Sequence, residues 1–266
     1  MKKILSAFVV SSLVLLVTAC NNAEEPQKKL TAGDLLDKSE QAMNSSLTSV
    51  SAHVVYDEYN GTVFDGDPEK TEKSGVNFDM NMDAFLDPMK VHRQVTVQPR
   101  GGEVWNMDIY DVGEQTVVAD SREQGLRESE TDPLKEAFGT LVSTTNPLVD
   151  LAKFKTFNDD FKLEEIGYDY VLKLSLDRDE FPRFKEIFPE VGPSEEGFLL
   201  IDRMEITIKI NKKTSYVTGF NMYADMKIYS KGNSFKTRQK LNATYSYFND
   251  IEDFTVPKEV TELVSR

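Results

Sequence analysis

The side chains that most often carry acid–base chemistry are scarce in this chain. It has two histidines, His53 and His92, and one cysteine, Cys20. A histidine can take up a proton near neutral pH and act as a general base. The two histidines fall in different predicted strands, and nothing near either one in the sequence marks a catalytic partner. We therefore expect both to be surface or rim residues.

Acidic residues gather at several points along the chain. The loop at 65–69 holds three acids and could hold Ca²⁺, but the ligand spacing of a calcium hand, closed by a distant bidentate glutamate, is missing. Acid pairs at 159–160, 164–165 and 195–196 could provide the two carboxylates of a glycoside hydrolase. The sequence does not show that any two of them lie on either side of a glycosidic bond. Dinucleotide-binding, Walker-type, nucleophile-elbow and zinc-protease motifs are absent. We expect no catalytic residues, no metal site, no cofactor and no enzymatic activity.

Length and charge restrict the classes of protein further. The chain has 266 residues, of which 39% are hydrophobic, so it can bury the core of one large domain or two small ones. Lys and Arg number 31 against 45 Asp and Glu, a net charge of −14. Nucleic-acid binding requires a basic surface, so we expect no nucleic-acid partner. One cysteine excludes a disulfide scaffold.

The first nineteen residues differ from the rest. Lys2 and Lys3 precede an apolar run at 4–17, and small residues precede Cys20. This order is typical of a secretory signal, and the run is shorter than the roughly 20 residues that cross a bilayer. We assign residues 1–19 to a signal peptide.

The segment Leu16-Val17-Thr18-Ala19-Cys20 resembles the lipobox of bacterial lipoproteins. The resemblance implies that the Cys20 thiol receives a diacylglyceryl group and becomes the mature N-terminus. The protein is then anchored on the extracytoplasmic face of the cell membrane, with the membrane as its partner. The alternative is an ordinary signal with a chance cysteine. Residues 20–30 are predicted to be the lipidated cysteine and a polar, flexible spacer.

Residues 31–266 show the periodicities of a folded domain. Thr31 and Asp34 fit the start of a helix, and apolar residues recur at helical spacing over about 32–44. Apolar and polar residues then alternate, as in antiparallel strands with one buried face. These alternating rows cover residues 76–84, 170–176, 204–210, 220–228 and 241–247.

Two segments have helical spacing in the middle of the chain. They are a helical insertion at about 133–154 and a shorter piece at 179–188. We therefore predict one α+β domain, with a long antiparallel sheet, an N-terminal helix and a helical insertion.

The predicted helices are too few to cover the apolar face of so long a sheet. Several methionines lie on its apolar rows, and methionine is an adaptable side chain that is common at apolar binding surfaces. Ordinary core filling is the alternative. The candidate lining positions are Phe78, Met80, Met82, Ile206, Ile208, Phe220, Met222 and Met226.

The order of parts is similar to the superfamily of outer-membrane lipoprotein carriers and mycobacterial lipid-carrying lipoproteins, and most similar to its uncharacterised Gram-positive lipoproteins. The residues that carry this likeness are the lipobox, the helix at 35–43 that leads through 45–50 into a strand, and the closing segment 251–260. The resemblance implies a curved half-barrel sheet around helices, with a cavity for acyl chains and no catalytic residues. The helical insertion could instead plug that cavity.

Two functions follow. The first is a non-enzymatic envelope lipoprotein that binds a lipid or acyl chain on the concave face of its sheet. The alternative is a protein-interaction or regulatory module with a filled core, which docks on another envelope protein through an acidic surface.

Overall fold

We examined the protein in a computed structural model. The structure describes residues 30–63, 71–123, 125–131, 133–134, 148–180, 183, 192–194, 197–230 and 233–264. The signal peptide, Cys20, the spacer up to residue 29 and the acidic loop at 65–69 therefore lie outside the described residues.

The first element is the helix α1 (Ala32–Ser46), which confirms the helix predicted over 32–44. The Thr31 hydroxyl accepts a hydrogen bond from the backbone N–H of Asp34 at 3.1 Å, and the Asp34 carboxylate accepts one from the Thr31 N–H at 3.1 Å. This reciprocal pair satisfies two backbone donors that a helix start leaves free. Leu35, Leu36 and Met43 form the buried stripe of the helix.

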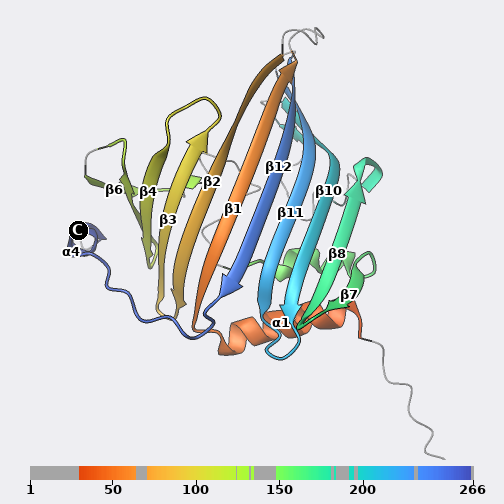
Figure 1. The fold of residues 1–266 in the computed structure, drawn as a ribbon, viewed down its shortest axis with the longest axis horizontal. Helices are drawn as coiled ribbons and strands as arrows, with labels where there is room; N and C mark the ends of the chain where they lie inside the picture. The colour runs from red at the N-terminus through yellow and green to blue at the C-terminus, as the bar shows by residue number, and fades with distance from the viewer. Residues whose placement is uncertain are drawn as a thin grey trace, which may run out of the picture.

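One large antiparallel sheet makes up most of the molecule (Figure 1). Its strands are β1 (Ser49–Val63), β2 (Thr71–Leu86), β3 (Met89–Pro99), β4 (Trp105–Val112), β5 (Gln115–Asp120), β6 (Leu126–Ser129), β7 (Lys162–Ile166), β8 (Asp169–Asp177), β9 (Gly192–Ser194), β10 (Gly197–Asn211), β11 (Val217–Ser230) and β12 (Asn233–Ser246).

The sheet consists of two meanders that meet at its centre. The strand order is β6-β5-β4-β3-β2-β1-β12-β11-β10-β8-β7, and β9 pairs with the start of β10. The first and last strands are neighbours, with Ser51 opposite Ser246 and Val63 opposite Ser234. The edge strands β6 and β7 stand at opposite ends of this order, so the sheet is an open half-barrel. The predicted α+β half-barrel is thus confirmed.

The two sides of the sheet differ in burial. On β3, Val91, Arg93, Val95 and Val97 are buried, and most residues between them are exposed. We call the side that carries the main apolar core the inner face and the other side the outer face. The helix α1 lies across one end of the strands (Figure 1), and its buried stripe belongs to the same core.

The helical segments in the middle of the chain are only partly described. Pro133 and Leu134 are helical, and residues 135–147 of the predicted insertion lie outside the described residues. The end of the insertion is a 3₁₀ helix, η1 (Leu151–Phe157), which runs past the predicted end at 154. Of the segment predicted at 179–188, the structure describes the end of the 3₁₀ helix η2 (Arg178–Glu180) and the single residue Arg183.

A C-terminal helix was not predicted. After β12, the chain runs along the ends of β1 to β3 and reaches α4 (Lys258–Val264) beside β5 and β6 (Figure 1). Val260 and Val117 are fully buried, and neither belongs to the main core. Since Val118 next to Val117 does face that core, α4 covers the outer face of β5 and β6.

Candidate ligand-binding face

The structure brings all eight candidate lining residues onto the inner face. Phe78, Met80 and Met82 lie on β2, and the other five lie on β10 and β11. Ile206 is opposite Met222, and Ile208 is opposite Phe220. The strands β1 and β12 separate the two groups, which therefore form two patches of one surface.

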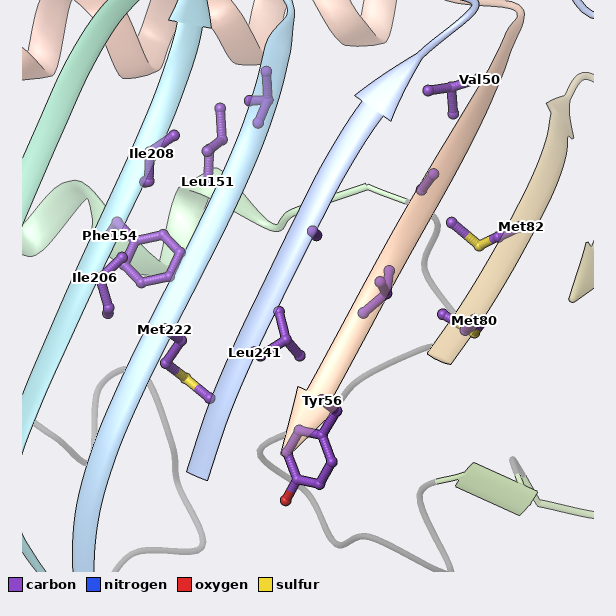
Figure 2. Packing of buried hydrophobic residues seen from close by; sticks show 14 of the residues in the cluster. Val50, Tyr56, Met80, Met82, Leu151, Phe154, Ile206, Ile208, Met222 and Leu241 are labelled. Carbon is purple, nitrogen blue, oxygen red and sulfur yellow. The ribbon is translucent and has the colours of Figure 1, made fainter. Parts of the chain in front are cut away.

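The two patches are connected by inner-face residues of β1 and β12. Figure 2 shows Leu241 of β12 between Met222 and the inner-face side chains of β1. Met80 and Met82 lie on the far side of β1. Val54 and Ala243 are direct cross-strand partners at this junction. The apolar surface is therefore continuous from β10 to β2.

The candidate residues are covered by other parts of the chain. The three on β2, the two on β10, Met222 and Met226 are each at most 4% exposed, and Phe220 is half-buried. The ring of Phe154 in η1 lies 6.0 Å from the ring of Phe220, and Leu151 of η1 also points to this surface (Figure 2). The inner face is packed as a protein core.

Methionine and alanine are interleaved on the inner face. Ala52 of β1 is opposite Met82, and Ala224 of β11 is opposite Met204. A long flexible side chain beside a short one can change rotamer without moving the backbone. The expected position of methionines on the apolar rows is confirmed for six that are buried there: Met80, Met82, Met107, Met204, Met222 and Met226.

The apolar surface becomes polar in the half of β1 that is far from α1. Tyr56 is fully buried and its ring stacks on Phe78, with centroids 5.0 Å apart. Its hydroxyl donates to Glu58 Oε2 at 2.6 Å, and Gln239 Nε2 donates to the same oxygen at 2.8 Å. Asn60 Nδ2 donates to Glu58 Oε1 at 2.6 Å. These four residues form a cluster, here called the polar end.

The buried phenol in this cluster is a permanent hydrogen-bond donor. Burial, and then the neighbouring Glu58 carboxylate, raise the pKa of the Tyr56 hydroxyl far above its ordinary value. The polar end was missed in the sequence. Glu58 is the next alternate residue of β1 after Val54 and Tyr56, so its side chain lies on the same inner face. This alternation is the signal that could have identified Glu58 from the sequence.

A buried ion pair also lies on the inner face, and no local pattern of residues indicated that its members would pair. Arg93 of β3 is fully buried, and its Nη2 lies 3.0 and 2.8 Å from the two carboxylate oxygens of Asp111 in β4. Thr116 of β5 donates to Asp111 at 2.8 Å. This ion pair links three strands of the first meander.

The strands and helices that form the inner face lie within a stretch of the chain that matches a protein family. Residues 31–264 match the family described as "Family of unknown function (DUF6612)". The chain belongs to this family. The match begins at the cap of α1 and ends at the last residue of α4. The DUF6612 domain is therefore the whole described fold.

Two solved structures have a distant likeness to this DUF6612 domain. The beta-barrel-like protein of domain of unknown function DUF1849 from Brucella abortus is 10% identical, with 74% of this chain and 99% of that chain covered and a TM-score of 0.25. The translocator domain of the autotransporter NalP from Neisseria meningitidis is 9% identical, with 80% and 94% covered and a TM-score of 0.19. No curated protein matches the sequence.

The two histidines of the DUF6612 domain lie on its outer face, as expected. His53 is exposed, and its Nε2 is 3.1 Å from both carboxylate oxygens of Asp79. His92 stacks on Tyr110 at 4.5 Å, and its Nε2 is 3.0 Å from Asp108. Both are held by carboxylates of neighbouring strands.

Metal-binding clusters and membrane-spanning helices can be judged for the described residues. Within them, no group of three or more His, Cys, Asp or Glu side chains could hold a metal ion. No helix in this part of the DUF6612 chain is long and apolar enough to cross a membrane.

Proposed function

We propose that this protein is a non-enzymatic envelope lipoprotein that binds a hydrophobic ligand, a lipid or an acyl chain, against the inner face of its sheet. One observation carries the proposal. A continuous apolar surface rich in methionine and alanine extends over one curved sheet from β10 to β2.

The physical basis is the free energy of apolar burial. Each methylene removed from water contributes roughly 0.8 kcal/mol, so an alkyl chain along one strand gains substantial binding free energy. The chain's own side chains cover this surface, and binding therefore requires them to move aside. Methionine side chains reduce the free energy needed for this rearrangement because they repack easily.

The membrane anchor is part of the proposal. A diacylated Cys20 provides two alkyl chains, enough for stable attachment to the extracytoplasmic face of the membrane. The polar residues up to Leu30 then connect the anchor to the cap of α1. The half-barrel with a leading helix agrees with the resemblance to the lipoprotein carrier superfamily, and we place the function in that class.

The proposal is tested with the chain from residue 21 to its end. The main core and α4 both lie within residues 30–264, so this chain is expected to retain the fold. Native mass spectrometry of this protein purified from cells is expected to show a bound lipid mass. A bare protein mass, together with no uptake of a fluorescent alkyl probe that carries no charge, would contradict the proposal.

The low exposure of the inner face supports a second candidate. Seven of the eight lining residues are at most 4% exposed, as in a filled core. A protein of this kind acts as an interaction module that docks on another envelope protein, and crosslinking in cells then recovers one dominant partner.

Charged substitutions distinguish the two candidates. Met222→Lys or Met226→Lys abolishes uptake of the fluorescent alkyl probe and leaves the fold intact if these side chains line a binding space, but unfolds the protein if they fill a core. Asn221→Lys, on the outer face beside Met222, is the matched control. It is expected to change neither uptake nor folding.

A further inference from the structure

The polar end combines a carboxylate with three neutral hydrogen-bond donors. Tyr56, Asn60 and Gln239 donate to Glu58 at 2.6, 2.6 and 2.8 Å. No Lys, Arg or His among the described residues forms an ion pair with Glu58. The inner face thus carries a half-buried carboxylate that, within the described part of the chain, is held by neutral donors and by no cationic side chain.

A second acceptor at the same place is left without a donor. Gln239 is 6% exposed, and its Oε1 has no hydrogen-bond partner in the described part of the chain. Its Nε2 donates to Glu58, which orients the amide and leaves Oε1 as the second acceptor of the polar end. An unpaired buried acceptor has a free-energy cost, and a bound ligand that donates a hydrogen bond removes that cost.

The polar end is continuous with the apolar surface. Phe78 is one of the candidate lining residues and stacks on Tyr56, and Glu58 is the next inward residue of β1. Figure 2 shows Tyr56 at the end of the row that begins with Val50, with its hydroxyl directed away from that row. At about 3.3 Å per residue, the distance from Val50 to Tyr56 is roughly 20 Å, which suits an extended alkyl chain.

We propose that the polar end binds the protonated amine of an amphiphilic ligand whose alkyl chain lies on the inner face. An alkylammonium group has three N–H donors, and so can serve both the Glu58 carboxylate and Gln239 Oε1. It also neutralises the charge of the carboxylate, which a hydroxyl group does not. A fatty acid is disfavoured here, because two carboxylates would then lie side by side.

This inference rests on the proposed binding of a hydrophobic ligand, so its test compares three probes with the same alkyl chain. Tetradecylamine, tetradecanol and tetradecanoic acid are titrated into the chain from residue 21 by displacement of a fluorescent alkyl probe. The amine is expected to bind at least about tenfold more tightly than the alcohol, and the acid most weakly. Equal binding of amine and alcohol overturns the inference and leaves the proposed function in place. Binding of none of the three overturns the proposed function as well.

The variant Glu58→Gln tests the assigned residue. It keeps the shape of the side chain and is expected to reduce amine affinity to the level of the alcohol, with alcohol affinity unchanged within about twofold. Asp57→Asn is the matched control, because it removes the same charge one residue away on the outer face. Unchanged amine affinity in Glu58→Gln, or an equal loss in Asp57→Asn, contradicts the assignment.

A second variant addresses the buried acceptor. Gln239→Met removes Oε1 together with the Nε2 donor to Glu58, and is expected to weaken amine binding by about threefold to tenfold, with a smaller effect on the alcohol. If either variant fails to fold, the preference of the unaltered protein for the amine over the alcohol still decides the inference. Phosphatidylethanolamine compared with phosphatidylglycerol then separates a lipid headgroup from a simple alkylamine as the source of the amine.

Discussion

The guanidinium of Arg93 and the carboxylate of Asp111 form a two-oxygen contact at 3.0 and 2.8 Å on the inner face of the sheet. Both side chains are buried, so each charge is stabilised by the opposite charge beside it. A charge left alone in such surroundings is strongly unfavourable, whereas the intact pair gives a smaller net stabilisation.

The first prediction concerns this ion pair. Arg93→Met or Asp111→Leu is expected to lower the free energy of unfolding by about 3–5 kcal/mol, because each removes the opposite charge beside a buried charge. The double variant is expected to lose much less than the sum of the two. Urea unfolding followed by the fluorescence of Trp105, the only tryptophan, measures this. Additive losses would show that the two charges act independently.

The second prediction concerns the start of α1. Thr31→Ala removes the hydroxyl that accepts from the Asp34 N–H and is expected to cost about 1 kcal/mol in the free energy of unfolding. Thr31→Ser keeps the hydroxyl and serves as the control. Equal stability of the alanine and serine variants would show that the cap does not stabilise the domain.

The third prediction concerns acid stability. Hydrogen bonds from Arg122 lower the pKa of the Asp120 carboxyl below its ordinary value of 3.8. A lowered folded-state pKa gives stability that is present above the ordinary pKa and is lost as the pH falls through the lowered one. Asp120→Asn is therefore expected to flatten the decline in unfolding free energy below about pH 4.

The control for acid stability is Glu114→Gln, which removes an exposed carboxylate before β5. Urea midpoints at several pH values give the comparison. A decline as steep in Asp120→Asn as in the unaltered protein would exclude Asp120 as a source of acid sensitivity.

The fourth prediction concerns the anchor. Cys20→Ser removes the thiol that lipidation requires, and the protein is expected to leave the membrane fraction. Asn22→Ser, two residues further on, leaves the thiol in place and is expected to remain membrane-bound. Fractionation of cells followed by immunoblotting distinguishes the two variants. Membrane retention of Cys20→Ser would refute the lipid anchor.

The fifth prediction concerns α4. Val260 is fully buried beside β5, and Val260→Asp is expected to detach the helix from the outer face. Hydrogen exchange should then increase in α4, β5 and β6 and stay unchanged in β10 and β11. Glu259→Ala, at an exposed position of the same helix, is the control. Uniform exchange changes over the whole sheet would mean that α4 is not a separate outer layer.

Some elements were predictable because their signals are local. The cap and apolar stripe of α1 involve residues within a few positions of one another, and the helix ends only two residues beyond the prediction. The period-two rows at 204–210 and 220–228 became β10 and β11, because alternation directly reports which side chains are buried. The helix α4 was not predicted, since seven residues give little periodicity and its burial depends on Val117 from a distant strand.

The candidate site divides in the same way. Alternation alone put Met80, Met222 and the other candidate residues on an apolar face, because neighbouring residues in the sequence determine which side chains of a strand share a face. The sequence could not show that Glu58 meets Gln239, 181 positions later, or that Arg93 meets Asp111. Those contacts depend on which strands become neighbours and in what register. Tertiary structure decides this, because the pairing of β1 with β12 joins the two ends of the domain.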